Sequence, residues 1–237
     1  MRRWFVPLCA LALATSIASP VLAVRGGNKG EAIWTAPDFD SVGVRSIAML
    51  PVATFDNSLE ARRAVENAIG QALRGTGYRW VSTLVTRDQI MRDGGDSLLK
   101  AFTQAVLRNG RLDSLDAPRF SRATHARALF TVRVDRFEHL ELTREQSGKP
   151  TTTVQLTAAL VDSTGRLLWS AGSSEVAEGP YQDANASALG VRASGLDNTA
   201  ITNQGGAPSY PETLTRLLAR WTPRFPVHRT LAPAPGN

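Results

Sequence analysis

The amino-acid sequence predicts an α/β protein in which helices pack on a mixed sheet, with the element order β-α-β-α-α-α-β-β-β-α. Two observations support this class. Residues 46–83 follow the pattern strand, helix, strand, which is typical of a βαβ-like unit. Residues 128–171 alternate apolar and polar side chains with a period of two, which predicts antiparallel strands with one face on a core.

The first unit begins with residues 46–52, a nearly continuous apolar run that predicts a short buried strand. Asn57 or Ser58 can cap the helix that follows, because their side-chain oxygens accept hydrogen bonds from free N–H groups of the first turn. Apolar residues recur on one face of that helix over residues 59–73. A second strand is expected at residues 78–83.

Three helices are expected next, and each has its own boundary signal. The first covers residues 86–91. The second begins at Asp96 or Ser97, both good caps, and ends before Gly110. The third begins at Asp116, with a proline in its first turn.

The second half of the chain predicts a meander of three strands and a final helix. These four elements are expected at residues 128–134, 154–160, 167–171 and 211–221. The apolar parity shifts near Asp135 and Arg136, which indicates a β-bulge. The segment Asp162–Gly165 predicts a hairpin turn, with glycine in the left-handed conformation.

The ends of the chain carry different signals. Residues 1–23 contain two arginines, an apolar stretch and a small-residue exit at Ala23, which is the pattern of a signal peptide. We expect cleavage after Ala23 and a soluble periplasmic or secreted protein without a membrane span, because a span needs roughly 20 apolar residues. The expected organisation is then an irregular leader at 24–43, one α/β domain at 44–226 with a long loop at 177–209, and a disordered tail at 227–237.

Three segments resemble a group of bacterial envelope modules. They are Ser46–Val52, Arg127–Val132 and the hairpin Leu160–Ser170. The group includes the periplasmic domain of the curli-export lipoprotein, the amino-terminal domain of TolB and the lipoprotein activators of penicillin-binding proteins. The resemblance implies an α/β sandwich with a non-catalytic role in envelope assembly or transport.

Patterns for catalysis and metal binding are weak in this sequence. Residues Ser97–Lys100 match the Ser-x-x-Lys of penicillin-binding enzymes, but the partner motifs of those enzymes are absent. His125, His139 and His228 are not spaced as metal ligands, and the single cysteine, Cys9, lies in the signal peptide. We therefore predict a non-enzymatic protein with no catalytic residue, no metal site and no cofactor.

Charge and location predict the kind of partner. The net charge is +6, and an exported protein rarely meets nucleic acid, so an anionic envelope polymer is one possible contact. Our main hypothesis is another envelope protein, bound through the 136–153 hairpin, the 177–209 loop or an exposed sheet edge. The residues predicted to bind it are Arg136, Glu138, Glu141, Arg144, Tyr181, Arg192, Arg216 and Arg220. The alternative hypothesis is a hydrolase or small-ligand binder acting on envelope polymers, which requires a pocket with converging polar groups.

Overall fold

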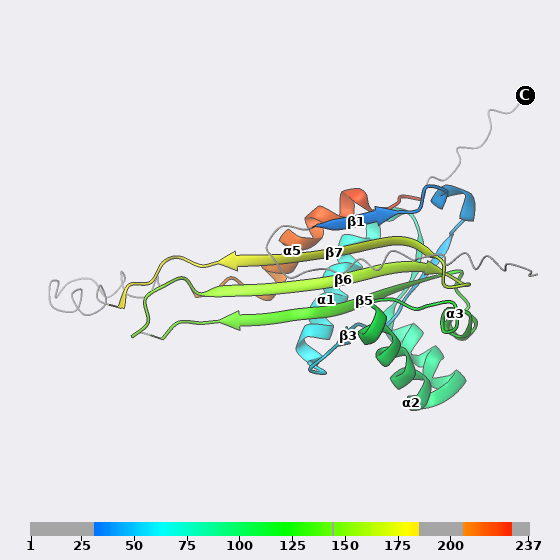
Figure 1. The fold of residues 1–237 in the computed structure, drawn as a ribbon, viewed down its shortest axis with the longest axis horizontal. Helices are drawn as coiled ribbons and strands as arrows, with labels where there is room; N and C mark the ends of the chain where they lie inside the picture. The colour runs from blue at the N-terminus through cyan, green and yellow to red at the C-terminus, as the bar shows by residue number, and fades with distance from the viewer. Residues whose placement is uncertain (1–30, 144, 185–205, 229–237) are drawn as a thin grey trace, which may run out of the picture.

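A computed structural model describes residues 31–143, 145–184 and 206–228, in which seven strands form one mixed sheet (Figure 1). The strands are β1 (Ala32–Thr35), β2 (Ser46–Met49), β3 (Ala53–Thr54), β4 (Arg79–Val81), β5 (Ala128–Leu140), β6 (Thr151–Asp162) and β7 (Leu167–Glu178). Their order across the sheet is β1-β7-β6-β5-β2-β4, and β3 pairs with β5 off this path. β2 runs parallel to β4 and β5, whereas β5, β6 and β7 are antiparallel neighbours.

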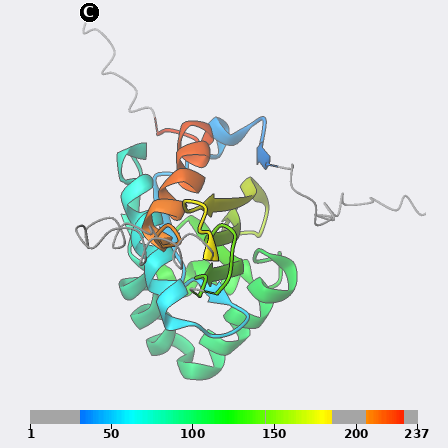
Figure 2. The same ribbon diagram turned by 90° about the vertical axis from the view of Figure 1, so that its left-hand side faces the viewer.

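Helices cover both faces of the sheet (Figure 2). The helices are α1 (Leu59–Ala72), α2 (Thr83–Asn109), α3 (Ala117–Thr124) and α5 (Tyr210–Trp221), with short 3-10 helices η1 (Phe39–Val42), η2 (Arg74–Thr76) and η3 (Thr222–Arg224). α1 and α5 pack on one face, and α2 and α3 pack on the other. The predicted α/β class, with helices on a mixed sheet, is confirmed. Within the described ranges, no helix is both long enough and apolar enough to cross a bilayer.

Two strands were not expected from the sequence. β1 lies within residues 24–43, which were expected to be an irregular leader; it forms because the free edge of β7 supplies hydrogen-bond partners for residues 32–35. β3, only two residues long, pairs with β5 in the same way. The first two predicted helices are both within α2, and the break predicted between them is confirmed at Gly95, whose φ of 61° and ψ of −159° are not helical.

Local signals for caps and turns are borne out. Ser58 Oγ accepts from the N–H of Ala61 and so caps α1. The register of β5 against β6 shifts just before Arg136, which confirms the predicted bulge. At the 162–165 turn, Asp162 N–H donates to Arg166 O at 3.0 Å and Gly165 has φ 86°, the left-handed conformation.

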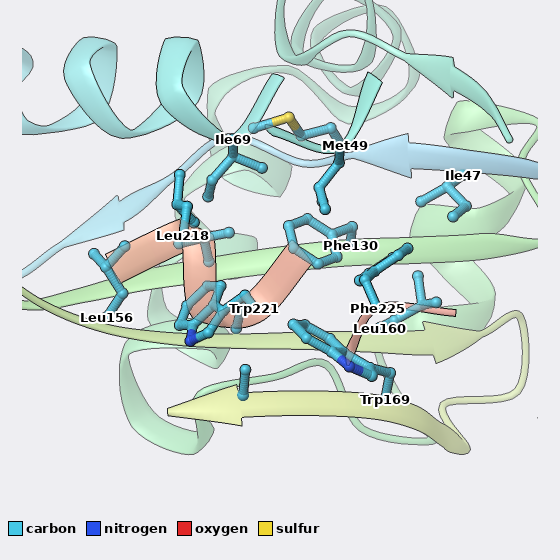
Figure 3. Close-up of a cluster of buried hydrophobic side chains, with 14 of the residues drawn as sticks. Ile47, Met49, Ile69, Phe130, Leu156, Leu160, Trp169, Leu218, Trp221 and Phe225 are labelled. Carbon is cyan, nitrogen blue, oxygen red and sulfur yellow. The ribbon is translucent and has the colours of Figure 1, made fainter. Parts of the chain in front are cut away.

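The larger core lies between the sheet and the α1/α5 layer, and Phe130 is at its centre (Figure 3). Phe130 is completely buried, and its ring centroid lies 5.6 Å from that of Trp80 and 6.0 Å from those of Trp169 and Phe225. Phe225 follows α5, so this cluster also fixes the chain after the last helix. The second core, on the α2/α3 side, includes an edge-to-face pair of Phe102 and Phe120.

The start of the predicted disordered tail is held by this packing. His228 N–H donates to Thr76 O at 2.9 Å, and its ring lies edge-on to Tyr78. Residues 229–237 lie outside the described part of the chain.

Truncating Phe130 should have a large effect on stability. Phe130→Ala removes a buried ring and leaves a cavity among three aromatic neighbours, so we expect the free energy of unfolding to fall by about 3–5 kcal/mol. Urea unfolding followed by tryptophan fluorescence measures it. Phe130→Leu is the matched control and should lose clearly less, because it fills most of the space; an equal loss from both variants would contradict this account.

Tyr78 should make stability depend on alkaline pH. Burial, together with the carboxylate of Asp40, raises the pKa of Tyr78 to about 12. The unfolded chain releases this proton near pH 10, whereas the folded protein keeps it to about pH 12, so the stability present below pH 10 is lost as pH rises through that window. Urea midpoints between pH 9 and 12 should fall less steeply in Tyr78→Phe than in the unsubstituted protein. If the midpoints of the two proteins fall in parallel, another group causes the loss of stability between pH 9 and 12.

Candidate partner-binding site

The long strands β5, β6 and β7 continue past the helices that cover one face of the sheet. α2 ends near the middle of these strands, where Arg133 Nη1 donates to Leu107 O at 3.1 Å and Gly110 packs against Thr157. Beyond this point β5, β6 and β7 continue, but α2 and α3 no longer cover them (Figure 1). We refer to this outer half of the three strands as the ribbon.

One face of the ribbon carries nine side chains that no described helix covers. Thr152 and Val154 are fully buried on the opposite face, so the alternate residues of β6 point to the uncovered one. The ladder places one residue of each strand in each of three rows. We call this set the open face: Arg136, Gln155 and Ser174; Glu138, Thr153 and Val176; Leu140, Thr151 and Glu178.

The open face is polar but carries little unbalanced charge. Arg136 Nε lies 3.1 Å from Glu138 Oε1, and Lys149 Nζ lies 2.6 Å from Glu178 Oε2, so its charges are paired. The remaining polar groups are hydroxyls and one amide. Leu140 and Val176 are 54% and 43% exposed and place apolar surface among them.

The bulge at Asp135 determines which side chains reach the open face. Asp135 Oδ1 accepts from Arg133 Nε at 2.6 Å, and Oδ2 accepts from Thr157 Oγ1 at 2.5 Å. The extra residue reverses the alternation of β5, so Arg136 lies on the open face and Phe137 on the covered one. Without the bulge, the two side chains would exchange faces.

An exposed aromatic ring lies next to the open face. Phe55 directly follows β3 and is 62% exposed. The guanidinium carbon of Arg133 lies 5.8 Å from the centre of its ring, and β3 pairs with β5 at Arg133, which places Phe55 beside the bulge. Exposed aromatic rings of this kind are frequent anchors of protein interfaces.

The other face of the ribbon is covered by the start of α5 and the residues just before it. Phe137 stacks on Tyr210, with ring centroids 3.7 Å apart and 13° between the planes. Burial, followed by the carboxylate of Glu60, raises the pKa of Tyr210. One face of the ribbon is therefore packed while the other is uncovered.

Residues on both sides of the predicted long loop are held at the tip of the ribbon. Gly148 and Gln182 exchange backbone hydrogen bonds of 2.9 and 2.7 Å. After residues 185–205, Ala207 N–H donates to Glu141 Oε1 at 3.1 Å, and Pro208 O accepts from Thr152 Oγ1. Residues 185–205, most of the loop, lie outside the described residues.

The edges of the ribbon are protected, unlike its open face. Arg220 from α5 donates to Ser174 O at 3.1 Å and pairs with Glu175 at 2.9 Å, so it occupies a backbone acceptor on the free edge of β7. The β5 edge carries the bulge and paired charges. Both devices discourage the addition of another strand.

The structure separates the predicted binding residues into distinct places. Arg136 and Glu138 lie together on the open face, whereas Glu141 holds the segment that covers the opposite face. Tyr181 is 65% exposed near the ribbon tip.

The remaining predicted residues do not join the open face. Arg216 pairs with Glu212 within α5, on the covered side of the sheet, and Arg220 is engaged at the β7 edge. Arg144 and Arg192 lie outside the described residues. Phe55, Thr153 and Val176 were not among the predicted binding residues. Alternation along the strands was the available signal, but it does not say which face the helices leave uncovered.

A hollow of about 460 Å³ lies on the other side of the molecule, between α1 and β4. Its polar lining includes Glu66, whose carboxylate accepts from Val52 N–H at 3.2 Å and from Thr83 Oγ1 at 3.3 Å. These bonds hold α1 against the sheet and the start of α2. Across the described residues, no group of three His, Cys, Asp or Glu side chains is placed to hold a metal ion.

Comparison with known proteins identifies no family for this chain. No family model matches the chain, and no curated protein matches it. The chain is similar to lipoprotein GNA1162 from Neisseria meningitidis, at 18% identity and TM-score 0.43, covering 68% of this chain and 96% of that one.

Two further solved structures are similar at the same level. One is the PelC dodecamer from Paraburkholderia phytofirmans, at 14% identity and TM-score 0.40, covering 81% of this chain and 95% of that one. The other is the LpoB C-terminal domain from Salmonella enterica, at 15% identity and TM-score 0.34, covering 55% and 81%.

Removing the carboxylate that holds the bulge should destabilise the protein. Asp135→Ala leaves the partly buried Arg133 and Thr157 without their acceptor, so we expect a loss of about 1–3 kcal/mol in the free energy of unfolding. Glu138→Ala, which removes only an exposed ion-pair partner three residues away, is the control and should change stability by less than about 1 kcal/mol. Chemical denaturation compares them; similar losses would show that the bulge does not depend on Asp135.

Proposed function

We propose that this protein is a non-enzymatic binding module of the bacterial envelope, which holds another envelope protein against its open face. It acts in the periplasm, after export and cleavage following Ala23. The observation that carries the proposal is the unequal covering of the ribbon, which is packed by α5 on one face and uncovered on the other.

The chemistry of the open face supports a protein as the partner. Protein interfaces combine an apolar centre with a polar rim and about one hydrogen bond per 100–200 Å². Val176 and Leu140 provide apolar surface, while Thr151, Thr153 and Gln155 offer groups that can donate or accept. The paired charges of the face give an anionic polymer little to bind.

The fixed geometry of the face also supports binding. The ladders hold the backbone beneath the nine side chains in register, so little backbone entropy is lost when a partner binds. The guarded edges favour contact through side chains rather than through an added strand.

The size of the face limits how it can be used. Three strands about 4.8 Å apart, each covering about five residues at 3.4 Å, span roughly 240 Å² in projection. A stable interface buries about 800 Å² on each partner. The partner must therefore reach beyond the nine side chains, and Phe55 and Tyr181 are the exposed aromatic residues on its two sides.

Site-specific crosslinking in the native host tests this function. A photo-reactive residue in place of Thr153, at the centre of the open face, should capture one envelope protein in stoichiometric amounts. Adding Val176→Arg to that variant should reduce the yield at least tenfold, because the long cation blocks close contact in the same row.

The matched control places the same photo-reactive residue at Ala219, an exposed position on α5. It should give no such product. Equal capture from both positions, or none from Thr153 in a protein that is folded by circular dichroism, would contradict binding through the open face.

A further inference from the structure

A chain of hydrogen bonds links the ribbon to the residues that precede α5. His139 Nδ1 lies 2.8 Å from Thr152 Oγ1, and His139 Nε2 lies 2.9 Å from Glu141 Oε1. Thr152 Oγ1 in turn donates to Pro208 O, and Glu141 Oε1 accepts from Ala207 N–H. His139 therefore contacts both side chains that bind the 207–208 backbone.

The donor and acceptor capacity of each group determines which atom carries the proton in each hydrogen bond of this network. The carbonyl oxygen of Pro208 can only accept, so the single hydroxyl proton of Thr152 is directed to it. Thr152 Oγ1 must then accept from His139, which requires a proton on Nδ1. The carboxylate of Glu141 can only accept, which requires a proton on Nε2. Both ring nitrogens of His139 are donors, and the ring is a cation.

Close packing shows that the 206–208 segment fits this position. A Cβ atom on Gly206 would lie 2.8 Å from Glu141 Oε1, and one on Gly179 would lie 2.6 Å from Gly206 O. Glycine at both positions allows the segment to lie directly against the carboxylate and against the end of β7. A side chain at position 206 would push against the carboxylate of Glu141, and one at position 179 would displace the backbone of Gly206.

We propose that His139 is a proton-dependent clamp, which in its cationic form holds residues 206–208 on the covered face of the ribbon. Imidazole is the side chain that changes charge between about pH 5 and 8. When the ring loses one proton, a lone pair faces either the hydroxyl oxygen of Thr152 or the carboxylate of Glu141. The hydrogen bond at that nitrogen is then lost, and its lone pair repels the oxygen that it faces.

Beyond Glu141 and Tyr210, the nearby charged groups are the carboxylates of Glu60, Glu138 and Asp56, which act on Tyr210. Glu141 is the ion-pair partner, and Tyr210 of α5 has its ring centre 5.5 Å from that of His139. Ala177, the β7 residue in register with Thr152, has no titratable group, and neither do residues 206–208. The charged form of the His139 ring is the one whose two N–H groups match the acceptors Thr152 and Glu141.

The clamp also lies next to the open face. Residues 206–208 lead directly into α5, whose Tyr210 stacks on Phe137, so release of the segment loosens the packing beneath the ribbon. Regulation of partner binding by this route rests on the proposed function, whereas the clamp itself does not.

Amide hydrogen exchange of the free protein tests the clamp without any partner. The protection factor of the Ala207 amide, which removes the intrinsic effect of pH on exchange, should fall roughly tenfold between pH 5.5 and 8, about the effect of one charge-assisted hydrogen bond. The nitrogen chemical shifts of the His139 ring should show two N–H groups at pH 5.5 and one at pH 8. A neutral ring at pH 5.5, or equal protection at both pH values, would overturn the proposal.

Two variants separate a proton effect from simple structural damage. His139 and Ala207 contact the same oxygen of Glu141, so Glu141→Gln must turn its amide to accept from Ala207 with the oxygen and donate to a neutral His139 ring with the nitrogen. With that rotation it should keep protection at pH 8. His139→Gln should give low protection at both pH values, and the control His125→Asn should behave like the unsubstituted protein. Loss of protection at both pH values in Glu141→Gln would contradict the assignment of a proton to each ring nitrogen of His139.

Crosslinking from Thr153 at pH 5.5 and pH 8 then tests the link to function. A yield that changes with pH in the unsubstituted background but not in Glu141→Gln supports regulation of the open face. Absence of any partner overturns the proposed function and leaves the exchange result standing. A pH-independent yield overturns only the regulation.

Discussion

The antiparallel ladder of β5, β6 and β7 is the constraint on which the rest of the fold depends. The β5–β6 pairing runs from the Ala128–Asp162 pair to the Leu140–Thr151 pair, broken only by the bulge at Asp135, and the β6–β7 pairing shifts register once, between Leu160 and Val161. Because side chains alternate with a period of two, this register alone decides which residues can join the core and which face solvent. The bulge is the one place where β5 reverses that assignment, and it lies where α2 ends.

The covering helices divide the ladder into two halves with different tasks. In the inner half, helices on both faces bury Phe130 and Leu129 on opposite sides of the same strand. In the outer half, only the α5 side is packed. Stability is therefore concentrated in the inner half, and the outer half depends on residues 206–210 for its single packed face. A segment with fewer buried contacts is also one in which local opening costs less than global unfolding.

Much of the fold is predictable from local sequence, but the candidate site is not. Alternation identified β5, β6 and β7, the parity shift identified the bulge, and Asp162–Gly165 identified the turn. β1 was missed because its conformation depends on the β7 edge, far away in sequence. Arg216 and Arg220 recur at helical spacing and so suggested a binding surface, yet Arg220 has its partner on β7. His139 gave no signal, because Thr152 and the 206–208 segment are distant along the chain.

The same alternation links the two faces of the ribbon. Glu138 lies on the open face and His139 on the covered face, and one peptide unit joins them. Thr152 and Thr153 are related in the same way on the next strand and are in register with them. A shift of the backbone that follows a change at His139 must therefore move the middle row of the open face as well. Coupling between the faces needs no long pathway through the protein, because it follows from the geometry of a single pleated ladder.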